Sequence, residues 1–225
     1  MKALAIDTSN DYLSLALCDQ EAILEYHEQV GQQHAEFILP TIQHLLSTAQ
    51  QSIGQLDAII YGNGPGTFTG IRVGASIAKG LALPCDIPLI PIPTLDAIAV
   101  QYVAHQAIFV AVDARMKQVY WRCYLTQDQR LIPEGLIAVN SPSDILLSCP
   151  SIGVGSGLAA YQAMFSDTLL ACLTEQYPHA KPTGRAYITL AKTSCYPKVS
   201  ADQANLLYIR NRVALTLDEQ RKLRT

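Results

Sequence analysis

Few residues of this chain are charged, and the positive ones are nowhere concentrated in a block. Charged residues make up 16% of the 225, with 16 Lys and Arg against 19 Asp and Glu and a formal net charge of -3. A protein that holds nucleic acid unaided usually carries a dense positive patch. A role near RNA would therefore have to come through a partner that supplies the positive surface.

The sequence also lacks long apolar runs and paired cysteines. No run reaches the roughly 18 apolar residues that a membrane span needs, and Asp7 interrupts the N-terminus before a signal-peptide core could form. The six cysteines are scattered without a CxxC pair, which is typical of reduced thiols inside the cell. These absences predict a cytoplasmic protein with no membrane association.

Apolar residues, by contrast, make up 49% of the chain, enough for a packed core, and their pattern occurs twice. The first copy predicts, in order, three strands, a helix, a strand, a helix and a strand, over residues 3–9, 12–19, 22–30, 34–52, 56–62, 71–83 and 87–93. The second copy predicts three strands, a capped helix, a strand and a helix, over residues 107–115, 118–126, 134–140, 141–149, 151–157 and 158–165. Each copy has the order of a ribonuclease-H-like unit.

Two such units predict an α/β fold with two ribonuclease-H-like lobes around a cleft. Actin, sugar kinases and Hsp70 ATPase domains share this architecture, the ASKHA type. We place the lobes at residues 1–100 and 101–225. A further helix is expected at 186–194, then a short apolar segment at 206–214 and a charged tail that frays. We expect the last helical segment to pack back on the N-terminal lobe.

A glycine-rich loop, GNGPGTFTGIR at 62–72, joins the fourth predicted strand to the next helix. It could hold a phosphate at the helix N-terminus, where free N–H groups and the helix dipole favour an anion. A P-loop would need a Lys-Ser/Thr pair that is absent here, and a dinucleotide fingerprint would follow the first strand. The residues therefore favour a tight turn that lets the helix pack closely through Gly74, Ala75 and Ala78.

Asp7 and Asp113 occupy matching positions on the first strand of each copy. In two-lobed ATPases such aspartates flank the phosphates and magnesium, whereas here Asp7 can instead cap its hairpin turn. No histidine pair is spaced i, i+4, and no HExxH motif or Cys/His cluster occurs, so no metal site is predicted. No GxSxG elbow supports a serine nucleophile, and we predict no catalytic residue.

The predicted helix at 34–52 is more apolar than a helix packed on one sheet requires. Its large apolar side chains include Phe37, Ile38, Ile42, Leu45 and Leu46. Two interpretations stay open: the helix is buried on most sides, or it offers a second face to another subunit.

Several motifs resemble the TsaB family. The segment 62–83 is very similar to that family's GPGSFTGLR…AKGLA, with Thr67 for the usual Ser and Ile71 for Leu. Three further motifs match at the expected positions: AIDTS, VDARMKQVYW and YIRNRVA, at residues 5–9, 112–121 and 208–214. The resemblance covers nearly the whole chain, from residue 3 to about 214.

The resemblance implies a non-catalytic subunit. TsaB proteins act with TsaD, which carries the metal and the acyl-transfer site, and with the ATPase TsaE. Together they transfer a threonylcarbamoyl group to N6 of adenosine 37 in tRNAs that read codons beginning with A. The paired-histidine metal motif of TsaD is absent here, since Ile38 stands four residues after His34. The alternative hypothesis is an active enzyme, either an ATP-binding kinase-like protein or a glycoprotease-like peptidase.

The resemblance also implies where the contacts lie. TsaB proteins bind TsaD through the N-terminal lobe, including the helix that matches 34–52, and isolated TsaB proteins form homodimers through an overlapping surface. We therefore expect residues 1–100 to bind the partner, with an interface of Phe37, Ile38, Ile42, Leu45 and Leu46. The glycine loop becomes a fold-shaping or vestigial phosphate loop, made by Asp7, Gly64, Gly66, Thr67, Gly70 and Arg72. No cofactor is expected beyond weak nucleotide binding.

Overall fold

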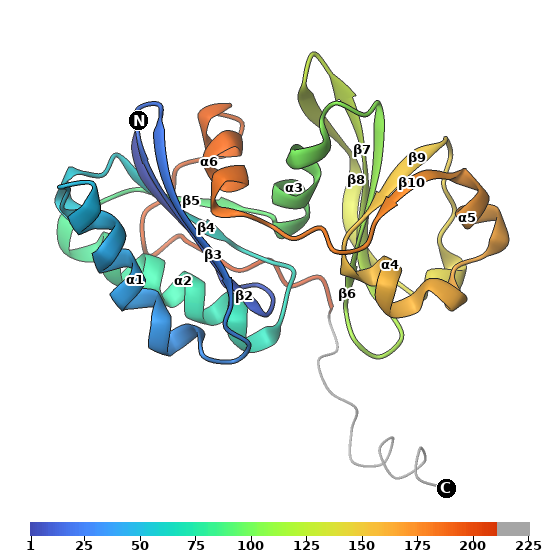
Figure 1. Cartoon of the computed structure of the whole chain (residues 1–225), viewed down its shortest axis with the longest axis horizontal. Coiled ribbons are helices and arrows are strands. Elements are labelled where there is room, and N and C mark those ends of the chain that lie inside the picture. Colours follow the sequence, from blue (N-terminus) through green and yellow to red (C-terminus); the bar gives the residue numbers. More distant parts are fainter. Residues whose placement is uncertain (211–225) are drawn as a thin grey trace, which may run out of the picture.

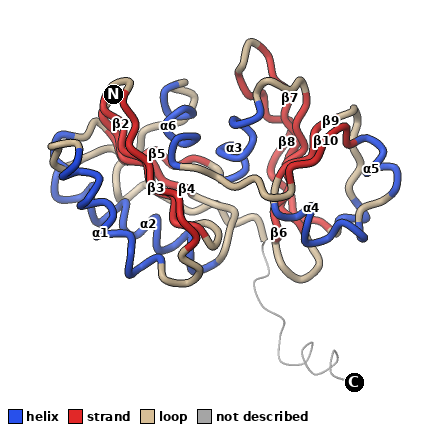
Figure 2. The backbone as a smooth tube through the Cα atoms, viewed as in Figure 1, coloured by secondary structure: helices blue, strands red, loops and turns tan. Residues whose placement is uncertain are grey.

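The computed structural model describes residues 1–210, which fold into two lobes joined at their centre (Figure 1). Each lobe contains a mixed five-stranded sheet, drawn in red in Figure 2. The strand order is β3-β2-β1-β4-β5 in the first lobe and β10-β9-β6-β7-β8 in the second. Counted from the antiparallel meander, both orders are the same, so the predicted pair of ribonuclease-H-like lobes is confirmed.

The N-terminal sheet begins as an antiparallel meander and ends with two strands parallel to its centre. Its strands are β1 (Lys2–Asp7), β2 (Tyr12–Asp19), β3 (Ala22–Gln29), β4 (Ala58–Gly62) and β5 (Leu89–Ile92). Two helices, α1 (His34–Thr48) and α2 (Phe68–Ala82), cover one face. The other face is covered by α6 (Gly184–Lys192), which comes from far along the chain.

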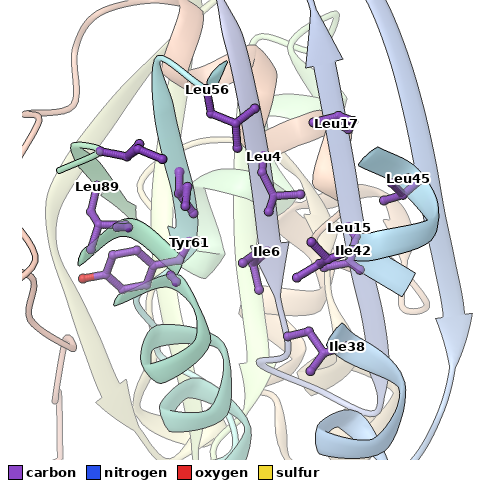
Figure 3. Packing of buried hydrophobic residues seen from close by; sticks show 14 of the residues in the cluster. Leu4, Ile6, Leu15, Leu17, Ile38, Ile42, Leu45, Leu56, Tyr61 and Leu89 are labelled. Carbon is purple, nitrogen blue, oxygen red and sulfur yellow. The ribbon is translucent and has the colours of Figure 1, made fainter. Parts of the chain in front are cut away.

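Helices cover both faces of this sheet, and successive side chains of a strand point to opposite faces. Leu4 and Ile6 of β1 point toward α1 and belong to the larger core cluster, shown in Figure 3. Ala3 and Ala5 point the other way, toward α6. These small residues let α6 approach closely: a Cβ on its first residue, Gly184, would lie only 2.6 Å from the β2 backbone. The close fit fixes α6 on the N-terminal lobe.

The C-terminal sheet repeats this plan with a longer hairpin. Its strands are β6 (Ala107–Asp113), β7 (Val119–Gln127), β8 (Arg130–Asn140), β9 (Ser151–Val154) and β10 (Leu173–Tyr177). Its helices are α4 (Ser156–Tyr161) and α5 (Asp167–Cys172). Short 3-10 segments within the described residues are η1 (Ile53–Gln55), η2 (Leu83–Cys85), η3 (Val100–Tyr102), η4 (Pro142–Asp144) and η5 (Gln162–Met164).

The helix predicted at 141–149 is wrong. Ser141 and Pro142 do begin a helical turn, but the turn is the single 3-10 segment η4. The backbone becomes extended at Ile145, with φ −88° and ψ 132°, and carries that side chain into the core of the C-terminal lobe. Burial of Ile145 in this extended conformation outweighs the local helix signal.

A short helix, α3 (Thr94–Ala99), lies between the lobes. Leu95 belongs to the core of the C-terminal lobe, while Ala97 packs with α6 on the N-terminal one. Between them, the buried carboxylate of Asp96 accepts hydrogen bonds from Tyr124 of β7 (2.6 Å) and from Tyr196, which follows α6 (2.8 Å). The helix therefore ties the two sheets together through one buried carboxyl group.

The segment after α6 also connects the lobes. It runs along the N-terminal lobe, where the Leu207 N–H donates to the Asn63 carbonyl of the glycine loop (2.8 Å). It then reaches the other lobe, where Arg210 Nη2 donates to the Ala114 carbonyl (3.1 Å). The end of the apolar segment expected at 206–214 and the charged tail lie outside the described residues. No helix in the described part of the chain has both the length and the apolar composition of a membrane span.

Candidate functional site

A large cleft lies between the lobes, with a volume of about 1030 Å³. It is bounded by the β1–β2 turn, the glycine loop with the start of α2, the end of β6, α4 and residues 180–182. Of the two aspartates at matching positions, Asp113 lines the cleft and Asp7 does not.

Asp7 is buried at the end of β1, and both of its carboxylate oxygens accept hydrogen bonds from the protein. Tyr187 of α6 donates to Oδ2 (2.7 Å), and Ser9 donates to Oδ1 through its hydroxyl (2.9 Å) and its N–H (3.2 Å). Burial raises the pKa of Asp7, and the hydrogen bonds from Tyr187 and Ser9 oppose this rise in part. Asp7 thus caps the β1–β2 turn through Ser9 and is hydrogen-bonded to α6 through Tyr187. It does not line the cleft.

Asp113 ends β6 and is half-buried at the edge of the cleft. Its Oδ1 accepts hydrogen bonds from the Arg115 N–H and the Tyr161 hydroxyl, both at 2.7 Å. Its Oδ2 forms an ion pair with the Arg115 guanidinium at 3.1 Å. Through these contacts the Asp113 carboxylate orders the turn after β6.

The glycine loop packs against the turn between β1 and β2. A Cβ on Gly66 would come within 2.5 Å of the Ser9 carbonyl oxygen, and a Cβ on Gly70 would overlap the carbonyl oxygen of Thr8. Two hydrogen bonds hold the segments together, from Thr67 N to Ser9 O (2.8 Å) and from Thr8 Oγ1 to Gly70 O (2.7 Å). Only glycine allows this approach of one backbone to another.

The remaining loop residues also make contacts inside the protein. Gly64 has a φ of +105°, and its carbonyl accepts from the Thr94 N–H that begins α3 (2.9 Å). Arg72 does not point toward a phosphate position: its Nη1 donates to the Phe68 carbonyl (2.9 Å), and its guanidinium lies 3.3 Å from the Phe68 ring centroid. The part of this loop that lines the cleft is residues 65–70, which include the start of α2.

The structure corrects the partner surface expected on α1. Four of its five residues lie in the core of the N-terminal lobe, with exposed fractions of 0 to 8%: Ile38, Ile42, Leu45 and Leu46. They pack on the sheet (Figure 3), because residues three and four apart share one face of a helix. Phe37 is 37% exposed, and the neighbouring Leu39, which was not predicted, is 47% exposed. Phe37 and Leu39 flank the buried stripe of α1 on opposite sides, because residues two apart in a helix are about 200° apart around its axis.

Charged groups in the cleft are paired with each other. Asp113 pairs with Arg115, and Asp11 pairs with Lys181 across the cleft at 3.1 Å. Within residues 1–210, no group of three His, Cys, Asp or Glu side chains is placed to hold a metal ion. The cleft can therefore accept a small polar ligand, and the charged side chains Asp11, Asp113, Arg115 and Lys181 that line it are engaged in ion pairs.

Two important residues of this region were missed in the sequence, Lys181 and Tyr187. Their hydrogen-bond partners Asp11 and Asp7 lie 170 and 180 residues away in the chain. A local sequence pattern cannot predict hydrogen bonds between residues so far apart in the chain. The sequence does predict the apolar helix that carries Tyr187. That Tyr187 bonds to Asp7 becomes clear only from the position of this helix on the N-terminal sheet.

Comparisons with known proteins agree over most of the chain. A protein-family model described as TsaD, tRNA N6-adenosine threonylcarbamoyltransferase, matches residues 23–205. The tRNA threonylcarbamoyladenosine biosynthesis protein TsaB of Haemophilus influenzae is 33% identical, with 93% of this chain and 94% of that protein covered. The protein of the same name in Escherichia coli is 39% identical over 55% of each chain.

A solved structure supports the same relationship. A crystal structure from Pseudomonas aeruginosa, described as an uncharacterized protein with similarity to peptidase YEAZ, superposes with a TM-score of 0.84 and is 28% identical. It covers 93% of this chain and 99% of its own. The two-lobed architecture is therefore shared over the full length of that protein.

Proposed function

This chain belongs to the TsaB family, and we propose that it acts in tRNA threonylcarbamoyladenosine biosynthesis as a cytoplasmic, non-catalytic subunit. One observation carries the proposal: a relative named for that pathway is 33% identical over 93% of this chain and 94% of its own length. Similarity that extends across both proteins argues for a shared role of the whole chain. If the two proteins shared only one lobe, the aligned region would be shorter.

The non-catalytic part of the proposal is supported by the cleft. The transfer joins a threonylcarbamoyl group to N6 of an adenosine, which needs a base near that nitrogen or an activated carbonyl. Asp7 is buried under α6, and Asp113 is held by Arg115 and Tyr161. We therefore assign the chemistry to a TsaD partner and the use of ATP to TsaE.

The partner surface that we propose is the outward side of the two helices on the N-terminal sheet. α1 and α2 lie side by side there (Figure 1). α1 exposes Phe37 and Leu39, and a further exposed apolar residue, Leu83, directly follows α2. Helices with exposed apolar residues commonly pair with helices of another subunit. A homodimer through the same helices would compete with TsaD, and tRNA would be reached mainly through the complex.

Complementation tests this function directly. An Escherichia coli strain depleted of its own TsaB would express this chain, and the threonylcarbamoyladenosine content of its tRNA would be measured by mass spectrometry. We expect the modification to be restored by the wild-type chain and lost with Leu39→Glu, which places a charge at an exposed apolar position of α1. Gln127→Glu, the matched control at the tip of the β7–β8 hairpin, should restore it fully. Failure of the wild-type chain, expressed and folded, would contradict the proposal.

A further inference from the structure

We propose that a surface at the mouth of the cleft contacts an unpaired segment of RNA. We call it the stacking face; its residues are Phe68, Arg72, Arg115, Met116, Lys117 and Tyr208. The inference rests on the proposed role in tRNA modification and adds to it a direct contact with the RNA. Phe68 and Arg115 also line the cleft, which places the face at the opening between the lobes.

The face is built around an arginine between two aromatic rings. The Arg72 guanidinium lies 3.3 Å from the Phe68 ring centroid and 5.2 Å from that of Tyr208. The rings remain 56% and 53% exposed, respectively, so they are not core residues. Exposed aromatic rings with an adjacent guanidinium are the surfaces on which unpaired bases stack, whatever their sequence.

A strained turn beside the stack presents more cationic side chains. Residues 115–117, which follow β6, have φ values of 61°, 56° and 59°. Three consecutive residues with side chains rarely adopt this left-handed conformation, which is unfavourable for each of them. All three are exposed, so no burial in the core explains the strain. Such strain is most often retained where the side chains have a function.

Arg210 joins the stack to this turn. Its Nη1 lies 3.2 Å from the Met116 Sδ, and its Nη2 donates to the Ala114 carbonyl (3.1 Å) and the Gln118 Oε1 (2.6 Å). Tyr208, two residues earlier on the same extended segment, lies beside Arg72. Residues from the two lobes and from the returning segment therefore form one continuous surface.

The charge of this surface is opposite to that of the chain. The segments 68–72, 113–118 and 206–210 contain four basic residues and one acidic residue, whereas the whole chain has 16 basic and 19 acidic residues. Among the residues that the structure describes, Arg72, Lys117 and Arg210 form no ion pair with a carboxylate. Aromatic residues, Met and Arg are also common at protein interfaces. Unpaired cations beside exposed rings favour RNA, which supplies both phosphates and bases.

Because the face is small and the chain is acidic in total, we expect weak RNA binding by the chain alone and a measurable contribution within the complex. The test uses the assembled complex with TsaD and an anticodon stem–loop transcript, with affinity measured by fluorescence anisotropy at several KCl concentrations. Lys117→Glu changes an exposed charge and should weaken binding about tenfold, lowering the salt dependence by roughly one phosphate contact. Tyr208→Ala should weaken binding about fivefold or more and leave the salt dependence unchanged.

Arg130→Glu is the matched control, because this exposed arginine lies at the far tip of the β7–β8 hairpin and forms no ion pair among the described residues. It should bind RNA as the wild type does. Unchanged RNA affinity with Lys117→Glu would overturn the inference, as would lost TsaD binding with RNA binding intact, which would make the face a protein interface. The proposed function is judged separately, by complementation with the wild-type chain.

Discussion

Three glycines of one helix test whether the glycine loop acts by shaping the fold. Gly70, Gly74 and Gly80 all lie in α2, where alanine is the better helix former by about 0.5–1 kcal/mol. Their surroundings differ. A Cβ on Gly70 would overlap the Thr8 carbonyl oxygen, a Cβ on Gly74 would lie 2.5 Å from the Thr8 hydroxyl, and a Cβ on Gly80 would meet nothing within 4 Å.

The expected effects follow from what each methyl group would displace. The Thr8 carbonyl belongs to a buried backbone turn that cannot rotate away, so Gly70→Ala should lower the free energy of unfolding by about 2 kcal/mol. The Thr8 hydroxyl can rotate away only by giving up its hydrogen bond to the Gly70 carbonyl, so Gly74→Ala should cost about 1 kcal/mol. Gly80→Ala should instead raise the free energy of unfolding by about 0.5–1 kcal/mol. Alanine has the higher helix propensity, and its methyl group would contact no other atom at this position.

Thermal unfolding followed by circular dichroism gives the order directly. For a chain of this size, 1 kcal/mol shifts the midpoint by about 2–4 °C. The midpoint of Gly70→Ala should therefore fall by about 4–8 °C, and that of Gly80→Ala should rise slightly. If Gly70→Ala is as stable as Gly80→Ala, the loop is not held against the β1–β2 turn, and the packing account of the glycines is refuted.

Three further predictions concern the core, the buried tyrosine and pH. Ile42→Glu should unfold the N-terminal lobe, whereas Leu39→Glu should change the thermal midpoint by less than about 2 °C; equal midpoints would refute the assignment of the two faces of α1. Tyr187→Phe removes a donor from the buried Asp7 carboxylate and should cost about 1–3 kcal/mol in urea unfolding; an unchanged value would mean that the bond contributes nothing. Burial raises the pKa values of Asp7 and Asp96 above 3.8 in the folded state, so the stability they contribute is present below about pH 4 and is lost as the pH rises through the raised values. Asp96→Asn should flatten the dependence of the unfolding free energy on pH above about pH 4, and an equally steep dependence would count against this linkage.

The predictable parts of the fold were those with long, regular patterns. β1 and β6 are short apolar runs, β2 and β7 follow them as alternating strands, and the repeated aspartate turns mark the two copies of the unit. Short elements without a long period, α5 and β10, were not predicted. The Ser141-Pro142 cap is a correct local signal, yet it cannot report that Ile145 is drawn into the core as extended chain.

The site was harder to predict because its contacts join distant segments. The glycines at 62–72 indicate close backbone approach, but the sequence does not name the segment that approaches, which is the turn at Thr8 and Ser9. The number of apolar residues in α1 did not tell which of them face the sheet and which face outward. Four large aliphatic residues cover the sheet, and only Phe37 and Leu39 remain outside.

A reconstituted transfer assay tests the central claim most directly. Transfer from threonylcarbamoyl-AMP to tRNA would be measured with this chain alone, with TsaD and TsaE, and with all three proteins. We expect sustained transfer only when this chain joins the other two. Transfer by this chain alone, or equal transfer by TsaD and TsaE without it, would contradict the account of a required, non-catalytic subunit.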